Sequence, residues 1–90
     1  MTPTVGIIGG GQLARMTHQA AIDLGIDLVV LCPDRDAPAL QAGARHLRGA
    51  PDQLDDLLRL AASCDVVTLD HEQTPPHLPD AVARRGHRVA

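Results

Sequence analysis

The sequence of 90 residues contains no Phe, Tyr or Trp and no lysine. Without aromatic rings the chain cannot stack exposed bases, which argues against binding to single-stranded nucleic acid. The formal net charge of -3 also disfavours a binder of phosphate backbones, since that requires clustered positive charge. Arginine supplies all of the fixed positive charge, and Glu72 is the only glutamate. We therefore expect no nucleic-acid partner.

Long apolar runs and cysteine clusters are missing as well. No apolar stretch approaches the ~20 residues that a membrane-spanning helix needs, so we expect no membrane partner. The first residues lack the basic region and apolar segment of a signal peptide, which predicts a cytoplasmic protein. Cys32 and Cys64 are isolated from each other, and each sits in an apolar stretch. Their spacing favours small buried thiols over a disulfide framework or a metal site.

What the chain does contain suits one small globular domain. Its apolar share is 44%, which is typical of a folded protein and too high for a disordered one. At this length only one modest core can form, and without aromatic residues it must be built from aliphatic side chains and methionine. We expect the chain to be one domain over residues 1–90.

The first third of the sequence has the pattern of a strand, a helix and a second strand. Val5–Ile8 is a short apolar run that ends in Gly9–Gly11, as expected of a buried parallel strand followed by a tight turn. Gln12–Leu24 has helical periodicity and is followed by Gly25, a typical helix stop. Asp27–Cys32 reads as the second buried strand. The apolar stripe of the predicted helix consists of Leu13, Met16, Ala20 and Leu24.

The alternation of helices and strands continues to the end of the chain. The elements that we expect are a short helix at Ala37–Ala44 with Pro38 in its first turn, an edge strand at His46–Gly49, a helix capped by Asp52, a strand at Asp65–Asp70, a helix at Leu78–Arg85 and the start of a strand at Arg88–Ala90. This order predicts an α/β fold, a Rossmann-like three-layer domain with a mostly parallel sheet. The last strand is so short that we expect it to be truncated.

The glycine turn after the first strand fits a known phosphate-binding pattern. Gly9, Gly11 and Ala14 match the G-x-G-x-x-A form of the dinucleotide fingerprint, between a predicted strand and a predicted helix. Such glycines allow the backbone to approach a phosphate, which the amino-terminal end of the helix then attracts. The alternative is a glycine turn that serves only the packing of strand against helix.

Acidic residues follow two other predicted strands. Asp34 lies about where an acid would bind the ribose of a dinucleotide, and Asp36 is the expected cap of the helix that follows. Asp70 and Glu72 are separated by one residue, so in an extended backbone both point to one face, about 7 Å apart. Such a pair could accept hydrogen bonds from the hydroxyl or amino groups of a ligand. The alternative is a solvated acidic loop.

Three segments of the sequence resemble the ATP-grasp ligases of purine biosynthesis. They are Val5–Met16 with its Gly-Gly-Gly-Gln-Leu run, Pro33–Ala39, and Cys64–Pro75 with its acidic pair. These segments follow the family's order and spacing, and the resemblance extends over nearly the whole chain. The resemblance implies that residues 1–90 are the amino-terminal pre-ATP-grasp domain, and that the ATP-grasp domain is absent.

The resemblance also implies an activity for the full-length protein. The enzymes it points to use ATP, Mg²⁺ and bicarbonate to carboxylate the exocyclic amine of 5-aminoimidazole ribonucleotide, and they are commonly homodimers. Substrate-binding residues carried over from the family are Gly10, Gly11, Gln12, Leu13, Asp70 and Glu72. The family's ATP- and metal-binding residues have no counterpart here, so we expect no catalytic residue, metal or cofactor on this chain and no ligase activity from it alone.

Some positions depart from the family pattern, and two other functions stay open. Cys32 stands where an aspartate is usual, Ala14 where a glycine is common, and Thr74 in place of valine. An NAD(P)-binding domain of an oxidoreductase would share the same strand–helix–strand start. The third possibility is a stand-alone, non-catalytic Rossmann-like module. The Gln12-Leu13 pair after the glycines favours the ligase.

Overall fold

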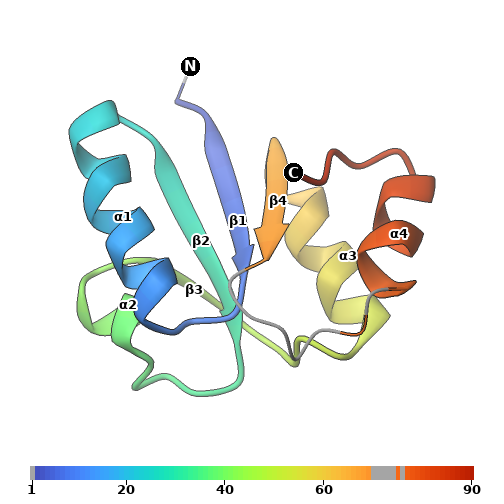
Figure 1. Cartoon of the computed structure of the whole chain (residues 1–90), viewed down its shortest axis with the longest axis horizontal. Helices are drawn as coiled ribbons and strands as arrows, with labels where there is room; N and C mark the ends of the chain where they lie inside the picture. Colours follow the sequence, from blue (N-terminus) through green and yellow to red (C-terminus); the bar gives the residue numbers. More distant parts are fainter. Residues whose placement is uncertain (1, 70–74, 76) are drawn as a thin grey trace.

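Four parallel strands form one sheet through the middle of the molecule (Figure 1). The computed structural model describes residues 2–69, 75 and 77–90. The strands are β1 (Thr4–Ile8), β2 (Asp27–Cys32), β3 (Arg45–Arg48) and β4 (Val66–Leu69), and their order in the sheet is β3-β2-β1-β4. Every pairing is parallel, and β3 lies at an edge as its sequence predicted. The predicted α/β fold with a parallel sheet is therefore confirmed.

Helices cover both faces of this sheet, which completes the three predicted layers (Figure 1). They are α1 (Gln12–Leu24), α2 (Pro38–Gln41), α3 (Leu54–Ala62) and α4 (His77–Arg84). The pair α1 and α2 packs on one face and the pair α3 and α4 on the other. Because side chains of a strand alternate between its two faces, β1 and β2 each contribute to two separate cores.

The two cores differ in the size of their helical side chains. On the α3–α4 face, leucine and valine from the helices meet the strands; the buried members are Ile8, Val29, Leu31, Leu57, Leu60, Ala61, Val67, Leu78 and Val82. On the α1–α2 face the buried helical residues are alanines; the members are Ile7, Ala14, Leu28, Val30, Cys32, Ala37, Ala39 and Ala44. Small side chains bring α1 and α2 close to the sheet, because no bulky group separates the backbones.

The apolar stripe that predicted helix α1 is not its buried face. Leu13, Met16 and Leu24 are 57%, 63% and 73% exposed, whereas Ala14 and Ala21 are buried against the sheet. The periodicity located the helix correctly but not the side that it buries. Two apolar stripes run side by side along α1, and close packing on the sheet selects the one made of alanine.

Both predicted helix caps are wrong. The cap position of α2 is Ala37, and no side chain caps it, while the Asp36 N–H donates to the Asp34 carboxylate at 2.9 Å. The cap position of α3 is Gln53 rather than Asp52. In each case an aspartate was assigned from local sequence alone, and the backbone enters the helix later than the pattern suggested.

The end of the chain reaches the sheet next to β4. The Val67 N–H donates to the Arg88 carbonyl, and the Ala90 N–H donates to the Val67 carbonyl, both at 2.9 Å. This isolated parallel bridge between Val67 and Val89 occupies the place where a strand was predicted to start. None of the helices in the described ranges is long and apolar enough to cross a membrane.

Candidate functional site

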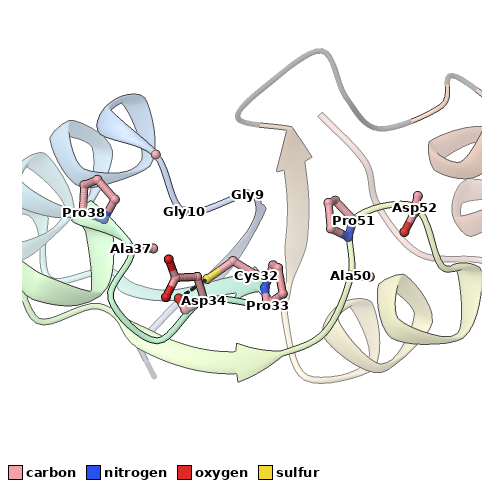
Figure 2. Close-up of a pocket in the computed structure, with 11 residues that line it drawn as sticks. Gly9, Gly10, Cys32, Pro33, Asp34, Ala37, Pro38, Ala50, Pro51 and Asp52 are labelled. Atoms are coloured by element: carbon pink, nitrogen blue, oxygen red, sulfur yellow. Dashed lines mark hydrogen bonds between the residues drawn. The ribbon is translucent and has the colours of Figure 1, made fainter.

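A cavity of about 520 Å³ opens at the carboxyl ends of β1, β2 and β3. Its size lies within the range of small-molecule sites, and its position is where open parallel sheets bind ligands. Figure 2 shows Ala37 and Pro38 at one end and the Ala50–Asp52 loop at the other, with the glycine turn and Cys32–Asp34 between them. The lining residues are Gly9, Gly10, Gly11, Cys32, Pro33, Asp34, Ala37, Pro38, Ala50, Pro51 and Asp52.

The glycine turn forms one wall of the cavity and has little room for side chains. Gly9 has a φ of 111°, which favours glycine, and its N–H donates to the Leu31 carbonyl at 2.8 Å. A Cβ placed on Gly10 would lie 2.8 Å from the Ala37 Cβ and 3.0 Å from the Cys32 Sγ. The Gly10 carbonyl also accepts the Ala39 N–H at 3.1 Å. The turn is thus packed against the start of α2 as well as exposing backbone to the cavity.

Helix α1 starts at this wall. Gly11 occupies its cap position with an extended backbone, and the first turn contains no acidic residue. The first N–H groups of any helix lack partners within the helix, and they carry a partial positive charge of about half a unit. An anionic group of a ligand would therefore be stabilised at the Gly11 end of the cavity.

The opposite walls carry two carboxylates. Asp34 follows β2, and Asp52 lies in the loop between β3 and α3. Within the described part of the chain, no arginine or histidine lines the cavity. The site therefore combines the amino-terminal end of helix α1 at one wall with carboxylate acceptors at others, which suits a ligand that has both an anionic group and hydroxyl or amino donors.

The Ala50–Asp52 loop was not assigned to the site from the sequence. The Ala50 N–H donates to the Asp56 carboxylate at 2.9 Å, so helix α3 holds the loop. The Gly49 N–H and the His46 ring both contact the Cys32 carbonyl, at 3.2 and 2.8 Å. Since β3 is a parallel neighbour of β2, its carboxyl end reaches the same rim. The predicted parallel sheet, with β3 at its edge, therefore already indicated that the loop after β3 would reach the site.

Cys32 lines the cavity but is not arranged as a nucleophile. Burial raises the pKa of its thiol, and the contact of its Sγ with the Asp34 carbonyl at 3.4 Å only partly opposes this effect. A raised pKa keeps the thiol neutral, whereas a reactive cysteine needs its thiolate. Cys32 therefore serves as a small apolar part of the wall, as its sequence context suggested.

The structure places four of the six predicted substrate-binding residues. Gly10 and Gly11 line the cavity, while Gln12 and Leu13 lie in the first turn of α1, outside the cavity lining and with exposed side chains. Asp70 and Glu72 lie outside the described residues. Strand β4 ends at Leu69, beside Ile8 of β1. Across the described ranges, no group of three His, Cys, Asp or Glu residues is arranged to hold a metal ion.

A second, smaller cavity of about 370 Å³ lies near the amino-terminal ends of β2 and β3. His18, Asp27 and Arg45 supply its charged and polar groups. The His18 Nδ1 atom is buried there without a hydrogen-bond partner among the described residues. This cavity is at the wrong end of the strands for the usual site of a parallel sheet, so the first cavity remains the candidate.

Comparison with known sequences gives a family match over the whole chain. The family model described as "Ribonucleotide synthetase preATP-grasp domain" matches residues 1–90. An N5-carboxyaminoimidazole ribonucleotide synthase from Mycobacterium leprae is 47% identical over 90 residues, which cover all of this chain and 20% of that relative. A protein of the same name from Brucella melitensis is 41% identical over 80 residues, covering 89% of this chain and 22% of the relative.

Solved structures agree with the sequence matches. The N5-carboxyaminoimidazole ribonucleotide synthetase of Thermotoga maritima superposes with a TM-score of 0.89 at 27% identity, over 98% of this chain and 24% of that one. The Aspergillus clavatus synthase, in complex with ADP and 5-aminoimidazole ribonucleotide, gives 0.86 at 34% identity, over 98% and 23%. The chain thus spans about a fifth to a quarter of these proteins. The resemblance to ATP-grasp ligases is confirmed, and the oxidoreductase alternative is not favoured.

Proposed function

Because the chain belongs to the ribonucleotide synthetase preATP-grasp family, we propose that it is the substrate-binding amino-terminal domain of an ATP-dependent ligase of purine biosynthesis. That ligase carboxylates 5-aminoimidazole ribonucleotide with bicarbonate. The observation that carries the proposal is the cavity at the strand ends, where the glycine turn and the start of α1 face two carboxylates. A ribonucleotide has the matching chemistry, because it combines a phosphate with ribose hydroxyls and, here, an amine.

Each wall of the cavity has a role in this proposal. Gly10 and Gly11 allow the ligand's anionic group to approach the backbone at the start of α1. Asp34 accepts a hydrogen bond from a ribose hydroxyl. Gln12 and Leu13 border the same end of the ligand from the first turn. Asp70 and Glu72 contact the substrate in the family pattern, with Glu72 as the principal carboxylate, and for this chain they stay predictions.

ATP and Mg²⁺ belong elsewhere in the proposed enzyme. The described residues do not fit a magnesium–triphosphate site, since the cavity presents two carboxylates and no basic side chain to a polyanion. Within those residues there is also no cluster of metal ligands. The relatives solved with ADP or ATP are about four times as long as this chain, which leaves room for a separate nucleotide domain. We propose a cytoplasmic, homodimeric enzyme in which this domain contributes substrate contacts and no catalytic group.

Calorimetric titration of the chain with 5-aminoimidazole ribonucleotide tests the proposal. We expect saturable binding that Asp34→Asn weakens about tenfold, the value of one charge-assisted hydrogen bond. Asparagine keeps an oxygen to accept the Asp36 N–H, so the local turn is retained. Asp36→Asn is the matched control, since Asp36 is exposed and outside the cavity lining, and it should bind as the parent does.

A parallel titration with NADH distinguishes the oxidoreductase alternative. Saturable NADH binding without any response to the ribonucleotide would reject the ligase proposal. Glu72→Ala then tests the carried-over carboxylate, and we expect it to abolish the heat of ribonucleotide binding. Unchanged binding in that variant would confine the site to the described cavity.

A further inference from the structure

The Cys32 carbonyl anchors the end of strand β2 where the chain turns into a wall of the cavity. This oxygen accepts the Gly49 N–H at 3.2 Å and a hydrogen bond from the His46 Nε2 at 2.8 Å. Both donors belong to the edge of the sheet, since His46 lies in β3 and Gly49 directly follows it. The next residue of the wall, Pro33, has no N–H with which to anchor itself. The edge strand therefore holds the point at which β2 ends.

The side chain of His46 is placed for this contact by the register of the two strands. His46 pairs with Val30, and Arg48 pairs with Cys32. Val30 and Cys32 belong to the core under α1 and α2, so His46 lies on the same face of the sheet. Its ring reaches towards the carboxyl end of the strands, where the Cys32 carbonyl lies. Because a carbonyl oxygen can only accept, the Nε2 atom carries the hydrogen and donates it. As a whole His46 is exposed, so its ring is not needed to fill the core.

The direction of the Cys32 carbonyl determines where Asp34 lies, because few rotatable bonds separate them. A planar peptide bond joins the carbonyl to Pro33, and the proline ring restricts φ to about −65°. Only the Pro33 ψ and the Asp34 φ then remain before the Asp34 side chain. Beyond this point the Asp34 carbonyl accepts the Ala37 N–H at 3.3 Å, and the Asp34 Oδ1 accepts the Asp36 N–H at 2.9 Å. A shift of the Cys32 carbonyl would therefore move the Asp34 carboxylate.

The Asp34 carboxylate keeps one oxygen for a ligand. Its Oδ1 is used by the Asp36 N–H, and within the described ranges no group donates to its Oδ2. Figure 2 shows Asp34 between the Ala37 end of the cavity and the Ala50–Asp52 end. A hydrogen bond to this oxygen weakens steeply when the donor and acceptor are misaligned. The position of the carboxylate therefore affects how strongly it can hold a ligand hydroxyl.

We propose that His46 is a positioning residue of the ligand site, whose Nε2–H holds the Cys32 carbonyl and thereby sets the Asp34 carboxylate for a hydroxyl of the ligand. The inference rests on the proposed function, which assigns Asp34 to the ribose. His46 acts through other residues, since it does not line the cavity. The Gly49 N–H continues the backbone pairing of β3 with β2, so His46 is the side chain that adds to this anchor.

Two substitutions of His46 separate the donor from the ring. In His46→Gln the side-chain amide nitrogen lies near the position of Nε2 and can still donate to the Cys32 carbonyl. In His46→Asn the amide lies near the position of Nδ1 and is too short to reach it. In calorimetric titration with 5-aminoimidazole ribonucleotide, His46→Asn should raise the dissociation constant about fivefold, the value of one hydrogen bond, and His46→Gln should stay within about twofold of the parent. Urea denaturation of each variant establishes that the titrated chains are folded.

The route through Asp34 is tested by combining substitutions. Asp34→Ala removes the carboxylate that His46 is proposed to position. If His46 acts through that carboxylate, adding His46→Asn to Asp34→Ala should change the dissociation constant by less than about twofold, because the two losses are not additive. A purely structural role of His46 would weaken binding equally in both backgrounds. Equal losses in the two backgrounds would therefore overturn the inference.

The remaining outcomes distinguish this inference from the function on which it rests. If the parent chain does not bind the ribonucleotide, the proposed function and the positioning role both fail. If the parent binds and His46→Asn binds as tightly, only the positioning role of His46 is overturned. An equal loss in His46→Asn and His46→Gln would assign the effect to the imidazole ring and not to its donor, which would also overturn the inference.

Discussion

The two faces of the sheet differ in what their side chains do. On the α3–α4 face, Leu57 and Leu60 are fully buried among other large aliphatic residues. On the α1–α2 face, the helices contribute alanine, and the large apolar residues of α1 point outwards. Burial of large aliphatic groups supplies most of the stability of a small domain. The alanine face instead lets the glycine turn, the Cys32–Asp34 loop and the start of α2 approach one another around a cavity.

The comparison shows that stability and site geometry are separated across one sheet. The leucine face, covered by α3 and α4, holds the strands in place. The alanine face, covered by α1 and α2, borders the cavity at the carboxyl ends of the strands. The Ala50–Asp52 loop connects the two, since helix α3 of the leucine face fixes a wall of the cavity. Substitutions in the leucine core should therefore act mainly on unfolding, and substitutions around the cavity should also act on the ligand site.

The largest expected effect comes from truncating the leucine core. Leu60→Ala should lower the free energy of unfolding by about 3 kcal/mol, because it removes a fully buried side chain and leaves a cavity. Leu24→Ala, at a leucine that is 73% exposed, should change it by less than about 0.5 kcal/mol. Urea denaturation of both variants checks the contrast, and similar losses would contradict the assigned faces.

A smaller but more local effect is expected at the glycine turn. Gly10→Ala should lower the free energy of unfolding by about 1–3 kcal/mol, since its Cβ would overlap the Ala37 Cβ. The double variant Gly10→Ala/Ala37→Gly removes that overlap and should be more stable than the sum of the single changes predicts. Thermal denaturation measures the coupling. Strict additivity would show that the turn is not packed on α2 as described.

The connection between the faces is tested at Asp56. Asp56→Ala removes the acceptor of the Ala50 N–H and the Arg59 ion pair at 3.2 Å, so we expect a loss of about 1 kcal/mol in stability. The affinity for the ribonucleotide should fall by more than the smaller fraction of folded protein would cause, because the released loop lines the cavity. Asp55→Ala, at an exposed neighbour in the same helical turn, is the control for both measurements.

The smallest effect concerns pH, with one thiol on each face. Burial raises the pKa of the Cys32 and Cys64 thiols above the ordinary 9.0. The folded state therefore favours the protonated thiols. Their contribution to the free energy of unfolding is complete below pH 9.0 and is lost as the pH rises through the raised pKa values of the folded protein. Stability should fall on the alkaline side of pH 9.0. Replacing both cysteines by alanine should make that fall shallower, which denaturation at several pH values will show.

The sequence predicted the element order well because each element carries a local signal. Helix α1 and strand β2 have the predicted bounds, and β3 was placed within one residue. The buried side of α1 was not predictable from periodicity, since two apolar stripes compete and only packing against the sheet decides between them. Both helix caps were missed because Asp36 and Asp52 are compatible with several turn geometries. The cavity depends on contacts between loops about 20 residues apart, so only its glycine wall and Asp34 were visible beforehand.

The central claim is that the strand-end cavity binds a ribonucleotide, and nitrogen–proton correlation spectra of the chain test it most directly. Addition of 5-aminoimidazole ribonucleotide should shift the amide signals of Gly9–Gly11, Asp34 and Ala50 in a saturable manner. The signals of Asp27 and Arg45, in the cavity at the other end of the strands, should not move. Saturable shifts confined to Asp27 and Arg45, or no shifts at all, would contradict the account.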